Sequence, residues 1–313
     1  MDHSRGDGGD GMSSGHTTAY QRLLAAAANL KVPDAVHRVA TAAPQDPRPG
    51  QIWRAMWEDT IELLLITAAG DDDTARVVPA SFERYADADT LLLPAQATTL
   101  EQPLALWWGL ETTVPWCVLD RQVSELTSHP DNLTSRALAD TVTGAQWGSR
   151  TVLSSAAGEY RAVLTGHFEV LSSAWWAPQG SGGLSELLGE HGITVKQLAA
   201  ELKLLPPLAL DVWRGQQPLT AEQAATLAAL LGQPAARFLD ANPALPPAVV
   251  HELNRPLRRS QVKKLSAQYD ETEHAARLRA AYGVYTLAAR DDNRTQPNWT
   301  ARTDRYFELL LDQ

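Results

Sequence analysis

Residues 194–215 read TVKQLAAELKLLPPLALDVWRG, and this stretch predicts two short helices joined by a tight turn. Threonine is a preferred N-cap residue, so Thr194 can start the first helix. Leu198 and Leu202 are four residues apart and therefore share one helix face. The two prolines suit the first turn of the second helix, and Gly215 can adopt the left-handed conformation that ends it.

The same short-helix pattern continues on both sides of this stretch. Residues 184–241 predict five helices in all, and Gly, Pro, Thr or Asp stands at their ends. The region resembles an Xre-type helix-turn-helix domain in the spacing of its small and apolar residues. The matching residues are Thr194, Leu198, Ala199, Leu202, Gly215, Leu227, Ala228, Leu231 and Gly232.

The resemblance implies a regulator that binds duplex DNA as a homodimer, with 184–245 as the helix-turn-helix domain. A recognition helix reads base edges with polar side chains near its start, but residues 205–209 are Leu, Pro, Pro, Leu and Ala. Asp211 would also repel phosphates. The remaining candidates for DNA contact in this domain are Lys196, Gln197, Arg214, Gln216 and Gln217.

The densest basic stretch is RPLRRSQVKK at 255–264. On a helix, Arg255, Arg259 and Lys263 share one face, and such a stripe could contact phosphates. A solvated helix face is the alternative explanation. The DNA-binding candidates in this stretch are Arg255, Arg258, Arg259, Lys263 and Lys264.

Three hypotheses for the helical domain stay open. The first is sequence-specific DNA binding. The second is DNA binding steered mainly by the basic stretch, with little reading of bases. The third is a helix-turn-helix retained for dimerisation or for a protein partner. The net charge of −10 does not decide among them, because local patches determine DNA contacts.

Upstream, short apolar and aromatic runs alternate with turn signals between residues 50 and 120. Examples are IWRAMW at 52–57, IELLLITA at 61–68 and ARVVPAS at 75–81, with the polar turn GDDDT at 70–74. Strands at this spacing predict a small antiparallel β-barrel. The segment DRQVSELT at 120–127 and the segment TSRALADTVTGAQW at 134–147 are expected to be helical, as is the run that ends at Trp176.

Residues 50–127 resemble the MazF/PemK toxin ribonucleases, which fold as SH3-like barrels. The similarity lies in GQIW at 50–53, VPAS at 78–81 and VLDRQVSEL at 118–126. The family's catalytic hydroxyl corresponds to Ser81, but Glu58 and Asp59 stand where its arginine is expected. We therefore interpret the barrel as a non-catalytic relative. A divergent ribonuclease that uses Ser81 and Arg76 is the enzymatic alternative.

Composition and motifs complete the expectations. No apolar run is long enough to span a bilayer, and the single cysteine, Cys117, lies in an apolar run and is expected to be a buried thiol. These features favour a soluble cytoplasmic protein. Each Trp pair, 107–108 and 175–176, is expected to expose one member if it lies on a strand. No metal-ligand spacing, phosphate loop or nucleophile elbow is present, so neither a metal nor a cofactor is expected.

The sequence thus predicts an α+β multidomain regulator: a barrel, then an all-α five-helix domain, then a helical C-terminal region. Its expected function is transcription regulation in a toxin–antitoxin or stress-response setting, with the barrel as a sensing or interaction domain. A protein-interaction scaffold, such as an antitoxin or a phage-defence component, is a second alternative. The expected segments are a disordered start at 1–16, N-terminal helices at 17–48, the barrel with appended helices at 49–177, a linker at 178–183, the helix-turn-helix domain at 184–245 and the basic helical region at 246–313.

Overall fold

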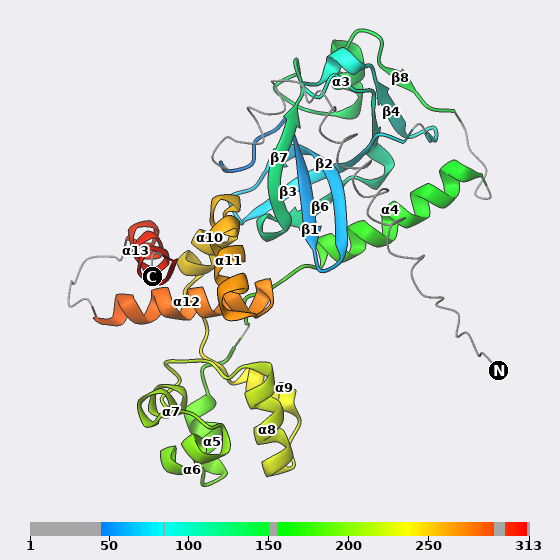
Figure 1. Ribbon diagram of the computed structural model, residues 1–313. Coiled ribbons are helices and arrows are strands. Elements are labelled where there is room, and N and C mark those ends of the chain that lie inside the picture. Colours follow the sequence, from blue (N-terminus) through cyan, green and yellow to red (C-terminus); the bar gives the residue numbers. More distant parts are fainter. Residues whose placement is uncertain (1–44, 84, 150–154, 179, 291–297, 312–313) are drawn as a thin grey trace, which may run out of the picture.

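The computed structural model describes residues 45–83, 85–149, 155–178, 180–290 and 298–311. The expected disordered start at 1–16 and nearly all of the expected helical segment at 17–48 lie outside these residues. Residues 45–48, the only described part of that segment, form no helix. The chain is an α+β protein with an antiparallel sheet first and helices after it, as Figure 1 shows.

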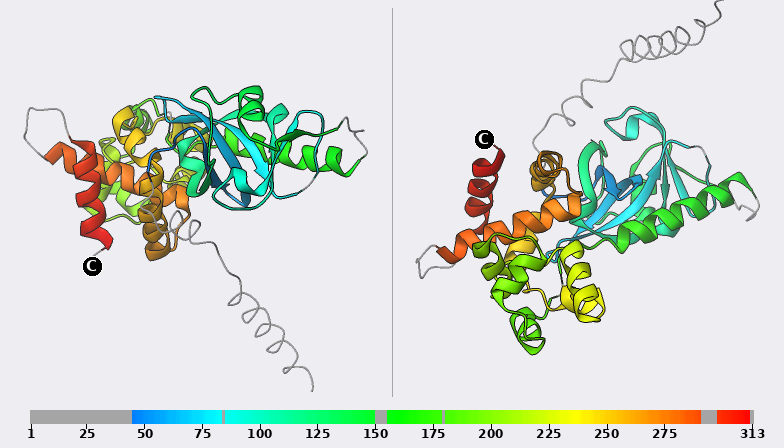
Figure 2. Two further views of the ribbon diagram at one scale, coloured as in Figure 1. Left: turned by 90° about the horizontal axis from the view of Figure 1, so that it is seen from above. Right: turned by 60° about the horizontal axis from the view of Figure 1, so that its bottom comes forward.

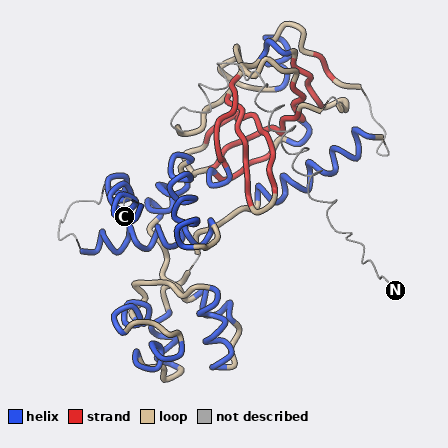
Figure 3. The backbone as a smooth tube through the Cα atoms, in the orientation of Figure 1, coloured by secondary structure: helices blue, strands red, loops and turns tan. Residues whose placement is uncertain are grey.

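The sheet has eight strands, and every pairing in it is antiparallel. Its order is β7-β1-β2-β3-β5-β4-β8, with β6 paired to β3, and Figure 3 shows the strands in red. The strands are β1 (Gln51–Trp57), β2 (Thr60–Ala69), β3 (Thr74–Ser81), β4 (Thr90–Leu93), β5 (Leu104–Trp107), β6 (Thr112–Pro115), β7 (Leu119–Glu125) and β8 (Gln146–Trp147).

Both faces of the central strands are buried. Successive residues of a strand point to opposite faces, so neighbours in the sequence enter different cores. Trp53 and Leu64 belong to the larger core, whereas Ile52 and Leu65 belong to the smaller one. The predicted turn at 70–74 closes β2 onto β3, where the Gly70 amide donates to the Thr74 carbonyl at 2.8 Å.

The helix expected at 120–127 is wrong, because residues up to Glu125 form β7. This strand pairs with β1, about seventy residues earlier in the chain, and the pairing contains two register shifts. The region at 134–147 is helical only over α3 (Ser135–Thr141), and it then forms β8. In both places a pairing between distant segments overrides local helix preference.

The C-terminal helices share one core with the sheet. The larger core joins Trp53 and Val77 of the sheet to Phe168 of α4, Val262 of α11 and Phe307 of α13. The expected separate C-terminal region at 246–313 is therefore part of a body formed with the sheet, seen from two further directions in Figure 2. The helices of this body after α3 are α4 (Ala156–Ser172), α10 (Pro247–Asn254), α11 (Pro256–Tyr269), α12 (Glu273–Arg290) and α13 (Trp299–Leu311).

The basic segment 249–268 is not one helix, because it breaks at Arg255. This residue has φ −59° and ψ 132° and lies between α10 and α11. The next residue is Pro256, and a proline pushes the residue before it out of the helical region. The break allows α11 to turn its basic face toward the sheet.

Between α4 and α10 the chain forms a five-helix unit with its own core. Leu188, Leu198, Val212, Leu227 and Phe238 are among the buried members of that core. The unit is set apart from the body in Figure 1. Its helices are α5 (Leu184–Glu190), α6 (Val195–Glu201), α7 (Pro206–Trp213), α8 (Ala221–Leu231) and α9 (Ala235–Asp240).

The segments that lead into and out of this unit run together at 180–182 and 240–242, which we call the neck. The Ser181 amide donates to the Asp240 carbonyl at 2.7 Å, and the Gly182 amide donates to the Asn242 carbonyl at 3.0 Å. The buried Asn242 side chain exchanges two further hydrogen bonds with the backbone of Leu219. The five-helix unit is thus inserted into the body, and its two ends are joined by hydrogen bonds.

The neck predicts a strong preference for glycine at position 180. A Cβ at Gly180 would lie 1.9 Å from the carbonyl oxygen of Asn242, so Gly180→Ala forces the neck apart. We expect urea unfolding to show a loss of about 1–3 kcal/mol, the usual cost of overpacking. Gly183→Ala is the control, because a Cβ there meets only the Ser181 hydroxyl at 3.6 Å. Equal stability of the two variants would contradict the close approach.

Candidate nucleic-acid interface

Helices α6 and α7 are joined by a turn that their own ends define. Thr194 and Gln197 form a capping box at the start of α6, where each side chain bonds to the other residue's backbone. At the end of α6 the chain reverses through Lys203, whose φ is 52°, and the Leu204 amide donates to the Ala199 carbonyl at 3.0 Å. This is the Schellman pattern, with a lysine in the left-handed position that glycine usually occupies.

Helix α7 is held against α6 by its buried face. Ala209 and Val212 are buried, and the Trp213 indole donates to the Ile193 carbonyl at 2.9 Å. The helix ends at Arg214, and Gly215 follows with φ 70°, as its sequence position predicts. The two helices therefore have a defined relative orientation.

The candidate DNA contacts of this unit lie at its surface. Lys196, Gln197, Arg214 and Gln216 are exposed, and Gln217 is half-buried. The carbonyl oxygen of the Gln197 side chain accepts from the Thr194 amide at 2.9 Å, so this residue also has a structural role.

Lys203 is an exposed cation in the turn that sequence reasoning left out of the candidate site. Its place between the two predicted helices was the signal that could have identified it.

The start of α7 is exposed and apolar. Leu205 is 75% exposed and Leu208 is 42% exposed, and Pro206 and Pro207 between them are exposed as well. We call these four residues the α7 tip. No side-chain hydrogen bond caps this helix.

The basic stripe at 255–264 is mostly not a surface for phosphates, which corrects its proposed DNA-binding role. Arg258 and Arg259 have side chains only 3% exposed. Arg258 donates through Nε to Glu252 at 2.7 Å. Arg259 donates to the Val118 carbonyl at 2.6 Å and the Met56 carbonyl at 2.8 Å. Both guanidinium groups therefore lie inside the body and bind its own carboxylates and carbonyls, so they do not face phosphates.

Two further members of the stripe pair with acidic side chains. Arg255 donates twice to Asp46, at 2.9 and 3.1 Å, and Lys263 donates to Asp120 at 2.5 Å. Of the five basic residues in this stretch, only Lys264 is exposed. These ion pairs could not be predicted from the sequence, because Asp46 and Asp120 are more than a hundred residues away from Arg255 and Lys263 in the chain.

Asp120 is at the centre of these ion pairs. Its side chain is 5% exposed and contacts Lys263 and Arg54, with Arg259 at 3.9 Å. Burial opposes ionisation of this carboxyl, but hydrogen bonds from Lys263 and Arg54 and the charge of Arg259 outweigh it and hold its pKa at about 2. The carboxylate is thus charged across the physiological range.

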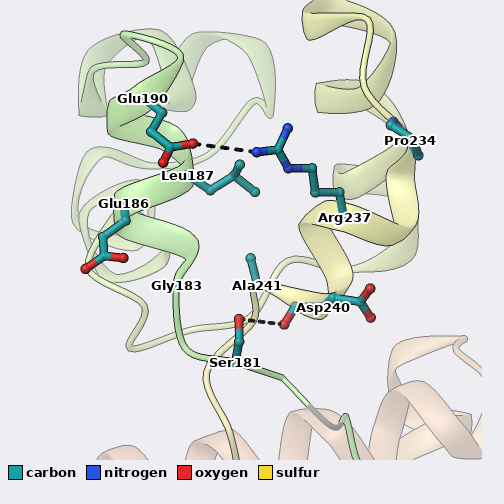
Figure 4. Close-up of a pocket in the computed structure, with 9 residues that line it drawn as sticks. All are labelled: Ser181, Gly183, Glu186, Leu187, Glu190, Pro234, Arg237, Asp240 and Ala241. Atoms are coloured by element: carbon teal, nitrogen blue, oxygen red, sulfur yellow. Dashed lines mark hydrogen bonds and ion pairs between the residues drawn. The ribbon is translucent and has the colours of Figure 1, made fainter.

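The five-helix unit also has an open groove of about 500 Å³ between α5 and α9. Figure 4 shows Arg237 pointing across it to Glu190, with nitrogen and oxygen 3.6 Å apart. The Ser181 hydroxyl at its base donates to the Asp240 carbonyl at 3.1 Å. Three acidic residues and one arginine line the groove, so its charge does not favour nucleic acid.

The residues of the ribonuclease alternative are not brought together. Ser81 is buried, and its hydroxyl accepts from the Trp107 indole at 3.1 Å. Arg76 lies five positions earlier on β3, which places it on the opposite face of the strand, and it pairs with Glu111 at 3.6 Å. Cleavage by this pair gains no support from the geometry.

Cys117 follows its sequence prediction, whereas only the Trp pair 175–176 exposes a member, and this pair does not lie on a strand. Cys117 is buried, and burial raises the pKa of its thiol to about 11, so it remains a neutral core residue. Trp107 is buried beside half-buried Trp108, and Trp176 is buried beside exposed Trp175.

The described residues contain no group of three His, Cys, Asp or Glu side chains placed to hold a metal ion. In the same part of the chain, no helix combines the length and apolar character needed to cross a membrane.

The buried stripe predicts a large difference between two neighbouring basic residues. Arg259→Ala removes one of the cations that face Asp120 and Glu273 and the donor to the Val118 and Met56 carbonyls, so we expect a loss of about 3–5 kcal/mol in urea unfolding. Lys264→Ala is the matched control, with an expected change within about 0.5 kcal/mol. A similar small effect of both substitutions would show that α11 is not anchored by Arg259.

The low pKa of Asp120 predicts a specific acid sensitivity. The folded pKa lies below the ordinary value of 3.8, so its stabilising effect is complete above pH 4 and disappears as the pH falls toward 2. The expected contribution is on the order of 2 kcal/mol. Urea midpoints at pH 6 and pH 3 detect about half of it, because pH 3 still lies above the folded pKa, and Asp120→Asn should lose less stability than the natural chain between these values. An identical loss in both proteins would contradict the assignment.

Comparison of the chain with models of known families, with curated proteins and with solved structures gives no match.

Proposed function

We propose that this protein is a DNA-binding transcription regulator whose α5–α9 unit is an Xre-like helix-turn-helix domain. The observation that carries the proposal is the α6–α7 pair, two short helices joined by a capped, tight turn with exposed cations around it. In helix-turn-helix proteins the second helix enters the major groove while the first contacts the backbone. Here α7 would enter the groove and α6 would lie across the phosphates.

The charges of the described residues indicate which cations are available for DNA. The arginines of α11 are buried in ion pairs, so the phosphate contacts of this proposal are assigned to the five-helix unit itself. Lys196, Lys203 and Arg214 are exposed on the α6–α7 segment. Because phosphate contacts orient a protein on the duplex and bring most of the electrostatic affinity, these three cations determine how the unit binds.

The sheet-based body then has a different role. By its resemblance to the MazF/PemK barrels it would be a non-catalytic sensing or interaction domain, in a toxin–antitoxin or stress-response system. The inserted position of the five-helix unit supports a division of labour, since each part has its own buried core. A homodimer on a palindromic site follows from the same resemblance.

The proposal predicts a modest salt dependence that depends on three residues. Three phosphate contacts give a slope of about −2.7 in log K against log salt for one protomer. Fluorescence anisotropy with a random 30-bp duplex and with duplexes from the DNA upstream of its own gene, at 50 and 200 mM salt, measures this slope. The variant Lys196→Ala/Lys203→Ala/Arg214→Ala should lose binding to all of them.

Lys264→Ala is the control, because this exposed lysine lies on the body, away from α6 and α7 (Figure 1). It should bind as the natural chain does. The DNA-binding proposal would be wrong if no duplex bound at low salt, or if the control lost binding and the triple variant did not.

A protein-interaction scaffold is a second candidate, and one observation favours it. Residues 181–250 contain four basic and six acidic side chains, and the surface of α7 begins with an apolar tip. Such a surface also suits a protein partner, which would be sought by copurification if duplex binding failed.

A further inference from the structure

The α7 tip has almost no hydrogen-bonding chemistry. From Leu204 to Leu210 no side chain can donate or accept a hydrogen bond. The first two residues of the helix are prolines, so they also lack the backbone N–H groups that a helix start normally presents. A helix start of this composition is a poor site for phosphate and a poor reader of base donors and acceptors.

The tip is nevertheless the most exposed apolar surface of the five-helix unit. Leu205 and Leu208 extend into solvent, whereas Ala209 and Val212, each one turn further along the helix, are buried. Helices α6 and α8 of the same unit each have a threonine as the N-cap residue and a capping box at their start. Among these three helices only α7 begins with a surface of apolar side chains.

Positive charge flanks the tip. Lys203 lies immediately before it in the turn, and Arg214 lies at the other end of the same short helix, both exposed. An apolar surface between cations complements a ligand that combines negative charge with apolar groups. In the major groove of DNA, the only apolar group that a base pair presents is the C5-methyl group of thymine.

We infer that the α7 tip recognises thymine methyl groups in the major groove, so that the preferred DNA is specified by the positions of thymines and not by hydrogen bonds at the start of α7. This inference rests on the proposed function and names the feature of the duplex that this helix reads. Leu205 and Leu208 make the contact, while Lys203 and Arg214 position the helix on the phosphates.

Replacement of thymidine by deoxyuridine tests the inference directly, because it removes the methyl group and keeps every donor and acceptor of the base pair. Duplexes of 20 bp selected by the protein from a random pool would be made in both forms and compared by anisotropy at 50 mM salt. Burial of one methyl group predicts about a fourfold weaker binding of the deoxyuridine duplex for each methyl in contact.

Substitutions in the tip separate this contact from the effect of methyl groups on DNA shape. Leu208→Ala, and independently the more exposed Leu205→Ala, should bind both duplexes with nearly equal affinity. Leu230→Ala is the matched control, because this leucine is also exposed but lies on α8. It should keep the full preference for thymidine.

The outcomes distinguish this inference from the proposed function. Failure to bind any duplex at low salt would overturn both. Equal binding of the thymidine and deoxyuridine duplexes would overturn the inference alone. The α7 tip would then be tested as a binding surface for a protein partner. A difference that persists in both tip variants would also overturn it, since DNA shape would be the cause.

Discussion

The insertion of the Arg259 guanidinium between α11 and the sheet is the contact on which the architecture depends. It donates to the carbonyl of Val118, just before β7, and to that of Met56 near the end of β1, and it is balanced by Asp120 and Glu273. A buried charge is tolerated only when it is paired and its donors are satisfied. This requirement fixes the position of α11 on the sheet, and the remaining C-terminal helices pack around α11.

The same contact determines which cations face solvent. Because Arg258 and Arg259 point inward and Arg255 and Lys263 pair with acidic side chains, the richest basic segment of the sequence stabilises the body. The exposed cations of the α6–α7 pair remain for a polyanion. The neck separates these two roles, since the hydrogen bonds between its two segments allow the five-helix unit to keep its own core beside the body.

Local signals predicted much of the fold. The strands β1 to β3, the turn at 70–74 and the helices α5 to α9 follow from side-chain periodicity and from Thr, Pro and Gly at element ends, which act within a few residues. The strand β7 and the inward face of α11 escaped prediction. Their stability comes from pairing with β1 and with Asp120, and these partners lie about 70 and 140 residues away in the chain.

The sequence by itself determined the α6–α7 pair, including the cap at Thr194, the stop at Gly215 and the apolar start at Leu205–Leu208. All of these depend on interactions between near neighbours in the chain. Only the tertiary structure decided that the C-terminal helices join the sheet in one core and that the arginines of α11 are interior. The reason is physical: the same arginine is a phosphate contact or a buried structural ion according to whether a distant carboxylate such as Asp120 is brought beside it.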